Sequence, residues 1–234
     1  MFTITRHKSP PDLGLLRQIV DMTVASAADL GLTAVPASNP LSGIYDLVLA
    51  MEINTYIAAI GHDNELLSGL VVATDRAAPD RLVGFLLYQG LANVLDGCGI
   101  NYMAVNAGDR RQGAARAMVE EVLRSHPHAT LTCTIAKVPY YEAMGFKIVG
   151  SRHNQVRMNT FGFSTSNVQN VLNVEAFLQH PQVQAAQRTL IQKYGTKALR
   201  DAEKQIKRGV ERGTTKAESY VRERLGPAGT TPGA

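Results

Sequence analysis

The sequence predicts a mixed α/β (α+β) domain, with a mostly antiparallel sheet flanked by helices, followed by a helical C-terminal extension. Three observations predict this fold class. Residues 1–163 switch between the two-residue periodicity of strands and the 3.6-residue periodicity of helices. Two apolar runs, 66–74 and 81–89, are separated by a short turn-like segment, as in a hairpin. Beyond Phe163 only helical periodicity remains.

The composition is typical of a globular protein, since 45% of the 234 residues are hydrophobic and 19% are charged. No apolar run reaches the ~18 residues that a membrane helix needs, and the first residues lack a signal-peptide pattern. We therefore expect a cytoplasmic protein with no membrane partner. Cys98 and Cys133 lie in strand-like runs, so we expect buried free thiols and no metal site.

The net charge of +4 is unevenly distributed. Residues 1–163 contain 13 Lys and Arg against 14 Asp and Glu, whereas residues 164–234 contain 11 against 6. The basic extension therefore predicts a separate partner surface. Acidic residues are mixed with its basic ones and no aromatic platform lies among them, so nucleic acid is not the expected partner.

The first sixty residues predict one strand and two helices. Residues 2–6 alternate apolar and polar side chains, as a strand does. The segment 9–12, Ser-Pro-Pro-Asp, is a helix-start signal, and apolar residues then recur at helical spacing to about Gly31. Ser42 is expected to cap a second helix with an apolar face over 44–51.

The middle of the chain predicts three neighbouring antiparallel strands, then a loop and a helix. The other expected strands are short apolar or alternating runs, at 66–74, 81–89, 98–105, 130–135, 147–150 and 155–161. The main helix is expected from about Arg111 to Ser125, where the proline at 127 stops it. A short helix should begin at Pro139 and end at Gly145.

The loop after Val105 has the composition of an anion site. It enters the helix through the segment 110–115, Arg-Arg-Gln-Gly-Ala-Ala. Small residues allow a ligand to approach the backbone, and the free N–H groups of a first helical turn bind phosphate oxygens. An ordinary strand-to-helix turn with a basic start is the alternative that this pattern leaves open.

Two motifs resemble a known superfamily. Arg110-x-x-Gly113-x-Ala115 after an apolar strand resembles the acyl-CoA loop of the GNAT N-acyltransferases, and the segment 141–146, Tyr-Glu-Ala-Met-Gly-Phe, resembles their Tyr-x-x-x-Gly-Phe segment. The resemblance covers residues about 1–163 and implies a GNAT-like acyltransferase domain. Residues 164–234 are then a linker and a basic amphipathic helical extension.

The resemblance implies transfer of an acetyl (acyl) group from the co-substrate acetyl-CoA to an amine, by direct attack on the thioester. It implies that the CoA is bound by Met103, Ala104, Val105, Arg110, Arg111, Gln112, Gly113, Ala114 and Ala115. The pyrophosphate would lie on the loop amides, and the pantetheine arm would pair along 103–105, where two parallel strands splay apart. A backbone N–H near Val105 would polarise the thioester carbonyl.

The resemblance also implies a proton donor for the leaving thiolate. Tyr141 matches the superfamily's tyrosine, and a phenol of pKa ~10 is protonated at neutral pH. Tyr140 is the alternative acid, and packing of both rings on the sheet is the structural alternative. The proton acceptor for the amine is left open among Glu52, Asp96, Asn101, Tyr102 and His153. The amine itself is not identified, since the shape of an acceptor pocket cannot be read from a fold.

The sequence departs from the superfamily pattern at several positions. Ala107 stands where proline is common, Arg111 replaces a glycine, and Thr134 and Lys137 stand where Asn and Ala often precede the tyrosine. These changes keep open a second class of function. In it, a catalytically decayed GNAT-like fold is a structural component of a large complex, for instance a phage particle.

The extension contains helical patterns at 174–180, 181–194 and about 196–225. Gly209 and Gly213 interrupt the last one, at ~1 kcal/mol each relative to alanine. Its apolar stripe is too thin for a core of its own. Residues 171–225 are therefore expected to dock on the preceding domain, on a second copy of the chain, or on a larger assembly. The composition of residues 226–234 is typical of disorder.

Overall fold

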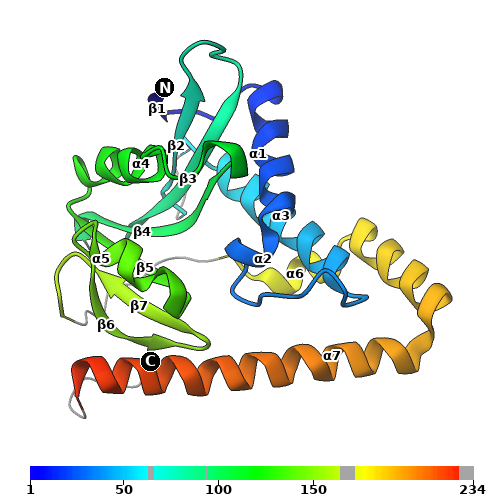
Figure 1. Ribbon diagram of the computed structural model, residues 1–234. Coiled ribbons are helices and arrows are strands. Elements are labelled where there is room, and N and C mark those ends of the chain that lie inside the picture. The colour runs from blue at the N-terminus through cyan, green and yellow to red at the C-terminus, as the bar shows by residue number, and fades with distance from the viewer. Residues whose placement is uncertain (63–65, 93, 164–171, 227–234) are drawn as a thin grey trace.

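The computed structural model describes residues 1–62, 66–92, 94–163 and 172–226. A seven-stranded sheet has helices on both faces, and a long C-terminal helix runs past one end of it (Figure 1). The strand order is β1-β2-β3-β4-β5-β7-β6, and every neighbouring pair is antiparallel except β4 and β5. The predicted fold class, a mostly antiparallel sheet flanked by helices with a helical extension, is therefore confirmed.

The strands are β1 (Phe2–His7), β2 (Ser68–Asp75), β3 (Leu82–Leu91), β4 (Val94–Val105), β5 (His128–Cys133), β6 (Lys147–Arg152) and β7 (Gln155–Asn159). The α-helices are α1 (Leu13–Ala25), α2 (Ala27–Leu30), α3 (Ser42–Ala58), α4 (Ala114–Leu123), α5 (Val138–Glu142), α6 (Val174–Leu178) and α7 (Pro181–Leu225). Two short 3₁₀ turns are η1 (Ala107–Asp109) and η2 (Ile135–Lys137).

The three central strands pair as the apolar runs predict, with β3 between β2 and β4. Their bounds differ from the predicted ones because an apolar run marks only the buried part of a strand. β4 begins at Val94 rather than at Cys98, and its second and third residues are exposed. β5 ends at Cys133 rather than at residue 135, because Thr134 leads into the 3₁₀ turn η2.

Two hydrophobic clusters lie on opposite faces of the sheet. On one face, Met118 and Val122 of α4 pack on the sheet together with α5. On the other face, α1 and α3 pack through fully buried residues such as Ile19 and Ile53. Each large apolar side chain buried in this way contributes about 1.5–3 kcal/mol. The sheet is thus held rigidly from both sides.

Both cysteines are buried and free, as expected. Burial raises the pKa of each thiol, Cys98 and Cys133, to about 12. Neither thiol is therefore ionised near neutral pH, and neither is suited to a role as a nucleophile.

The extension packs on the preceding domain. Within α7, Gly195 has non-helical backbone angles, so the two helices predicted at 181–194 and 196–225 are confirmed as two helical segments that meet at a kink. Val183, Leu199 and Ala202 pack with residues of α3. Farther along, Val221 joins the cluster on the α4 face of the sheet. Docking on the preceding domain is one of the three modes expected for residues 171–225, and the described residues of this segment, from 172 on, adopt it.

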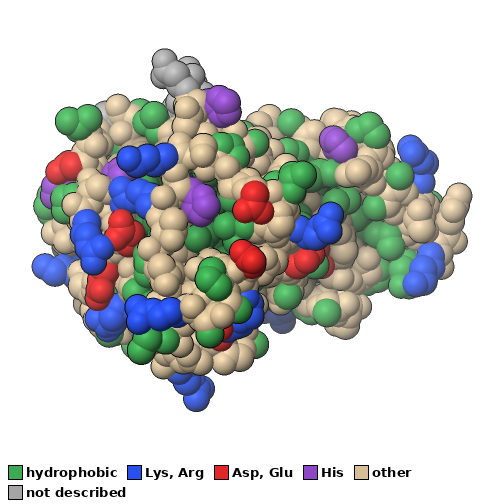
Figure 2. Space-filling view, turned by 90° about the horizontal axis from the view of Figure 1, so that it is seen from above, with side chains coloured by type: hydrophobic (Ala, Val, Ile, Leu, Met, Phe, Trp, Pro, Cys, Tyr) green, Lys and Arg blue, Asp and Glu red, His purple; other side chains and the backbone are tan. Residues whose placement is uncertain are grey.

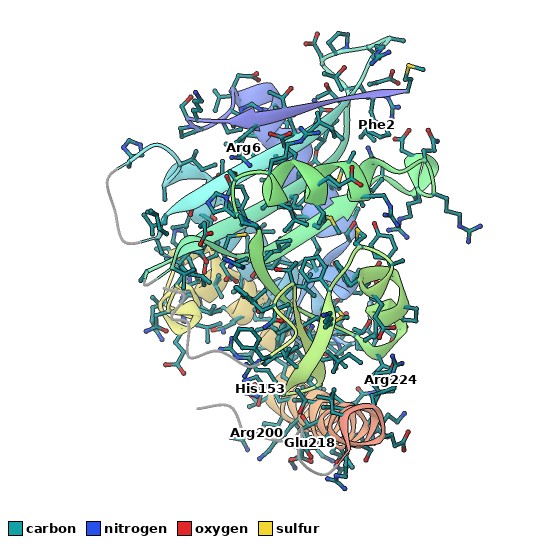
Figure 3. All side chains as sticks on the ribbon, turned by 90° about the vertical axis from the view of Figure 1, so that its left-hand side faces the viewer. Phe2, Arg6, His153, Arg200, Glu218 and Arg224 are labelled. Carbon is teal, nitrogen blue, oxygen red and sulfur yellow. The ribbon has the colours of Figure 1, made fainter. Side chains whose placement is uncertain are left out.

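The second half of α7 lies beside β6 and β7 (Figures 1 and 3). The turn between these two strands, which includes His153, faces the helix. Arg224 of α7 forms an ion pair with Glu142 at the end of α5. The predicted linker residues 164–170 lie outside the described residues, as does all but the first residue of the segment 226–234, which has the composition of disorder.

Acidic and basic side chains are interspersed on the face of the molecule shown in Figure 2, where no large field of one sign is visible. Within the described residues, no helix is both long enough and apolar enough to cross a membrane.

Candidate active site

β4 and β5 pair over only part of their length. Their parallel register runs from Gly97 and His128 to Ile100 and Leu131, whereas β4 continues along β3 as far as Val105. The two strands therefore diverge beyond Ile100. The divergence of these two parallel strands, which the resemblance to the GNAT superfamily implies, is therefore present.

A cleft of about 230 Å³ lies where the strands diverge. Residues from the α2 region, β4, α4, η2 and α5 line it: Ser26, Asp29, Leu30, Met103, Ala104, Val105, Arg110, Ala115, Lys137, Tyr140 and Tyr141. The lining thus includes several of the residues predicted from the sequence: Met103, Ala104, Val105, Arg110, Ala115 and Tyr141. It does not include Arg111, Gln112, Gly113 or Ala114.

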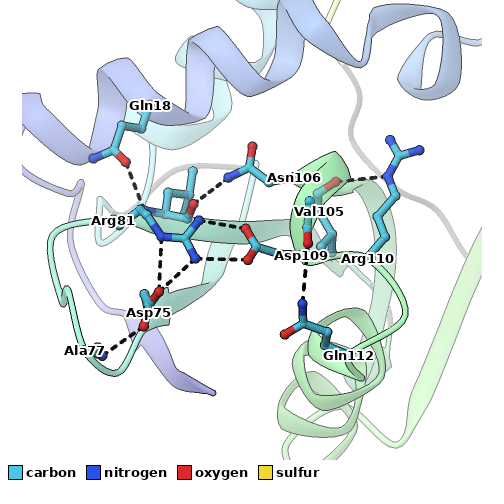
Figure 4. A network of polar contacts seen from close by, with 11 residues as sticks. Gln18, Asp75, Ala77, Arg81, Val105, Asn106, Asp109, Arg110 and Gln112 are labelled. Carbon is cyan, nitrogen blue, oxygen red and sulfur yellow. Dashed lines mark hydrogen bonds and ion pairs between the residues drawn. The ribbon is translucent and has the colours of Figure 1, made fainter.

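The loop between β4 and α4 is fastened to the start of β3. The amide of Asn106 donates to the Leu82 carbonyl at 2.6 Å, and its backbone N–H donates to the carbonyl of Val83 at 2.9 Å. Arg81 donates to both carboxylate oxygens of Asp109, at 2.8 and 2.9 Å (Figure 4). The loop therefore has a fixed position before it reaches the helix.

The helix after this loop begins later than predicted, at Ala114 rather than at Arg111. Arg111 and Gly113 both have left-handed backbone angles, with φ of +64° and +87°, and these turn the chain twice before the helix starts. Gly113 fits this conformation because it has no Cβ. The first intrahelical bond links the N–H of Ala117 to the Gly113 carbonyl, so the N–H groups of 114–116 have no helical acceptor.

The remaining predicted loop residues lie around this turn. Arg111, Gln112 and Gly113 are exposed, and the Gln112 amide donates to the carbonyl of Gly108 at 3.4 Å. Ala114 is only 2% exposed and packs in the core. Arg111 and Gln112 could therefore contact a ligand only outside the cleft, whereas Gly113 and Ala114 could contribute backbone amides.

Two cations flank one carboxylate in the cleft. Arg110 Nη2 lies 3.8 Å from one oxygen of Asp29, and Lys137 Nζ lies 3.7 Å from the other. Lys137 also donates to the backbone carbonyl of Asp29 at 2.9 Å, and Arg110 Nε donates to the Val105 carbonyl at 3.2 Å. Sequence reasoning missed Asp29, and it noted Lys137 only as a departure from the family pattern. No local sequence pattern could have identified Asp29 as a cleft residue, because α2 is remote in sequence from the loop.

Tyr141 and Tyr140 lie side by side in the cleft wall but differ in exposure. Tyr141 is 9% exposed and packs edge-on against Phe146, with ring centroids 5.9 Å apart. Burial is the main cause that raises the pKa of Tyr141 far above its usual value, so the phenol stays protonated. Tyr140 is 43% exposed, and partial burial raises its pKa as well. Both hydroxyls are proton donors near neutral pH.

Among the candidate proton acceptors, the structure brings Glu52 and Tyr102 together. The hydroxyls of Tyr102 and Tyr56 are the side-chain groups that act on the Glu52 carboxyl. Burial raises the pKa of the Glu52 carboxyl, and the nearby hydroxyls of Tyr102 and Tyr56 partly oppose that rise. Tyr56 was not predicted from the sequence, although it stands four residues after Glu52 on the same helix, where side chains meet.

The other three candidates lie elsewhere. Asp96 is 3.6 Å from His128, near the start of β4 and therefore at the opposite end of that strand from the cleft. Asn101 donates to the side chain of Gln89 at 2.7 Å. His153 is exposed in the β6–β7 turn. In the part of the chain that the structure describes, no group of three or more His, Cys, Asp or Glu residues could hold a metal ion.

Comparison with solved structures identifies the fold. The PaiA N-acetyltransferase of Thermoplasma acidophilum, solved in complex with coenzyme A, matches with a TM-score of 0.52 and 11% identity. The match covers 67% of this chain and 98% of that one. A Corynebacterium glutamicum protein described as histone acetyltransferase HPA2 and related acetyltransferase matches with a TM-score of 0.50 and 17% identity. It covers 68% of this chain and 95% of the other.

The chain has the GNAT acetyltransferase fold. The GNAT-like part accounts for nearly the whole length of both compared proteins, so about a third of this chain extends beyond them. Long helix α7 lies beyond the GNAT core. No protein-family model matches the sequence, and no curated protein matches it either.

Proposed function

We propose that this GNAT-like protein is an N-acyltransferase, which moves an acetyl group from acetyl-CoA to an amine by direct attack on the thioester. The observation that supports this most directly is the cleft between the diverging strands β4 and β5, which opens beside the start of α4. A narrow slot bordered by a free strand edge suits an extended, amide-containing arm. An adjoining helix start suits a diphosphate.

The residues that would hold CoA contribute different interactions. The N–H groups of 114–116 point out of the first turn of α4, and Arg110 and Lys137 would add charge at the cleft. The edge 103–105 would pair with the amides of the pantetheine arm. Because Arg110 occupies the Val105 carbonyl, binding in this mode requires the Arg110 side chain to turn away from it. A phosphate oxygen would be a stronger acceptor for this guanidinium than a neutral carbonyl.

Tyr141 is proposed as the acid that protonates the CoA thiolate. Tyr141 lines the cleft, and its hydroxyl remains protonated near neutral pH, as a proton donor must. The chemistry would consist of C–N bond formation at the carbonyl carbon, cleavage of the C–S bond, and proton transfer to sulfur. Acetyl-CoA is a co-substrate in this reaction, and the chain's own residues would bind it and orient its carbonyl.

The test is binding of acetyl-CoA, measured as a thermal shift of the full chain. A ligand present at 100 times its Kd stabilises a protein by about 2.7 kcal/mol. Ala115→Glu should abolish the shift, because it places a carboxylate in the cleft next to the expected pyrophosphate. The matched control is Ala117→Glu, which makes the same change two residues later, outside the cleft lining. It should retain the shift.

A wild-type protein that shows no shift at millimolar acetyl-CoA would overturn the proposal. That result would favour the alternative function, a GNAT-derived fold retained as a structural component of a larger assembly. An equal loss of binding in both variants would also count against the cleft, because only one of them alters its lining.

A further inference from the structure

Tyr140 and Tyr141, the two tyrosines of the cleft wall, stand on a very short helix. α5 comprises five residues, Val138–Glu142, and no side chain from the described part of the chain caps its N-terminus. An isolated helix of this length is not stable in water. The positions of both tyrosines in the cleft therefore depend on the groups that hold α5 from outside.

Two arginines from other helices bind the C-terminal end of α5. Arg116 of α4 donates to the carbonyl oxygen of Ala143 at 3.0 Å. Arg224 of α7 donates to Oε1 of Glu142 at 2.5 Å, and the two side chains form an ion pair. Because α7 lies beyond the GNAT core, the second of these contacts is an addition of this chain to the fold.

The side chain of Arg224 is itself fixed on α7. Its Nη1 donates to the hydroxyl oxygen of Tyr220 at 3.1 Å, one helical turn earlier, and the guanidinium carbon lies 5.7 Å from the centre of that ring. Val221, which follows Tyr220, is fully buried in the cluster that contains Tyr141. The guanidinium thus meets Glu142 from a helix that is anchored in the same core as the tyrosine.

Glu142 and Tyr140 lie on opposite sides of α5. Successive residues of an α-helix are about 100° apart, so side chains two positions apart point about 200° apart. Tyr140 lines the cleft, whereas Glu142 contacts α7. Tyr141, between them, packs edge-on against Phe146. A bond at Glu142 therefore fixes the rotation of α5 about its axis, and with it the directions of both tyrosines.

We propose that Arg224 is a positioning residue for the acetyl transfer. Through Glu142 it holds α5 in the orientation in which the hydroxyl of Tyr141 protonates the CoA thiolate. This role rests on the proposed function. Arg224 is not among the residues that line the cleft, so its loss should change kcat more than the affinity for acetyl-CoA. The C-terminal extension is then part of the catalytic unit.

The experiment compares Arg224→Glu with the charge-reversed pair Arg224→Glu/Glu142→Arg. The single change places two carboxylates next to each other, whereas the pair restores the attraction with its charges exchanged. Arg222→Glu is the matched control, because it makes the same change two residues earlier at an exposed position. All three proteins should keep the thermal shift with acetyl-CoA. Backbone hydrogen exchange of residues 138–142 should be faster than in the wild type only in Arg224→Glu.

Turnover is then followed as release of the CoA thiol, with spermidine, an aminoglycoside and a lysine-containing peptide as acceptors. We expect Arg224→Glu to lower kcat by about 10-fold, with the KM for acetyl-CoA within about threefold of the wild-type value. The charge-reversed pair should recover most of this loss, and Arg222→Glu should behave as the wild type. In a Tyr141→Phe background, Arg224→Glu should cause no further loss, because the hydroxyl that it positions is absent.

The outcomes separate the role of Arg224 from the proposed function. A wild-type chain that binds no acetyl-CoA overturns both. A chain that binds acetyl-CoA but releases CoA thiol with none of the three amines overturns the role of Arg224 alone. The same holds if Arg224→Glu loses the thermal shift, keeps the wild-type kcat or leaves the exchange of α5 unchanged. A charge-reversed pair that recovers no turnover, or a full further loss in the Tyr141→Phe background, would show that Arg224 acts only on stability and would also overturn its role.

Discussion

Arg81 holds Asp109 with two parallel hydrogen bonds, at 2.8 and 2.9 Å, and bonds Asp75 through the same guanidinium (Figure 4). Arg81 immediately precedes β3, Asp75 ends β2, and Asp109 ends the 3₁₀ turn of the loop before α4. One side chain thus ties the end of the β2–β3 hairpin to the loop proposed to receive the pyrophosphate. A bidentate arginine pair fixes orientation as well as distance.

Replacing this arginine should loosen the loop without unfolding the sheet. We expect Arg81→Ala to weaken acetyl-CoA binding by about 3- to 10-fold, a modest effect because ion pairs near the surface contribute little each. The affinity of Arg81→Lys for acetyl-CoA should lie between those of the wild type and Arg81→Ala. Lysine keeps the positive charge but cannot form two parallel hydrogen bonds with one carboxylate. Arg76→Ala, an exposed arginine in the same turn, is the control. If isothermal titration gives equal affinities of wild type and Arg81→Ala for acetyl-CoA, the bonds between Arg81 and Asp109 have no role in binding.

The bonds from Arg81 to Asp75 and Asp109 also make the free energy of unfolding at acidic pH depend on Arg81. Hydrogen bonds from Arg81 are the first cause that lowers the pKa of Asp75 and of Asp109 below the ordinary value in the folded protein. A carboxyl with a lowered folded pKa stabilises the fold above its unfolded pKa of about 4, and this stabilisation is lost as the pH falls through the folded value. We therefore expect the free energy of unfolding of the wild type to fall more steeply below pH 4 than that of Arg81→Ala. Urea titrations at constant ionic strength would measure the free energy of unfolding of both proteins at each pH. An equally steep fall below pH 4 in wild type and Arg81→Ala would contradict the expectation.

Tyr141 should affect turnover more than binding. We expect Tyr141→Phe to lower kcat by about 100-fold, since a positioned proton donor contributes on that order, while the Kd of acetyl-CoA changes by less than about threefold. Tyr140→Phe removes the neighbouring, more exposed hydroxyl and serves as the matched control. If Tyr140→Phe shows the larger loss, the role of the acid passes to Tyr140. If neither variant differs from wild type, a tyrosine acid is excluded.

Two glycines of α7 should respond in opposite directions to alanine. Gly209 faces open space, so Gly209→Ala should stabilise the protein by about 0.5–1 kcal/mol through helix propensity and a less disordered unfolded chain. At Gly213, a Cβ would lie 2.8 Å from the Cβ of Asn154 in the β6–β7 turn. Gly213→Ala should therefore lose that gain or destabilise the protein. Thermal unfolding of both variants measures the difference, and equal stabilisation would show that α7 does not pack against this turn in solution.

The helix boundaries show which features of the fold a local sequence pattern can predict. Gly113 and Gly145, picked out in two short motifs, both have left-handed backbone angles in the structure, and Gly195 divides α7 where the sequence predicts a break. In contrast, the start of α4 is three residues later than expected, because Arg111 adopts a left-handed conformation that no sequence rule assigns to arginine. Backbone preferences of glycine are local, and so they can be read from sequence.

The sequence by itself determined the order of strands and helices, the hairpin, and the loop between β4 and α4, because each follows from the periodicity or composition of a short segment. The resemblance of two motifs to a known superfamily added the cleft residues 103–105. Only the tertiary structure decided that Arg224 meets Glu142, that Asp29 lies between Arg110 and Lys137, and that α7 packs on its own sheet. These contacts join residues far apart in the chain. Their partners are selected by sheet pairing and by the faces that remain to be buried, neither of which a local pattern specifies.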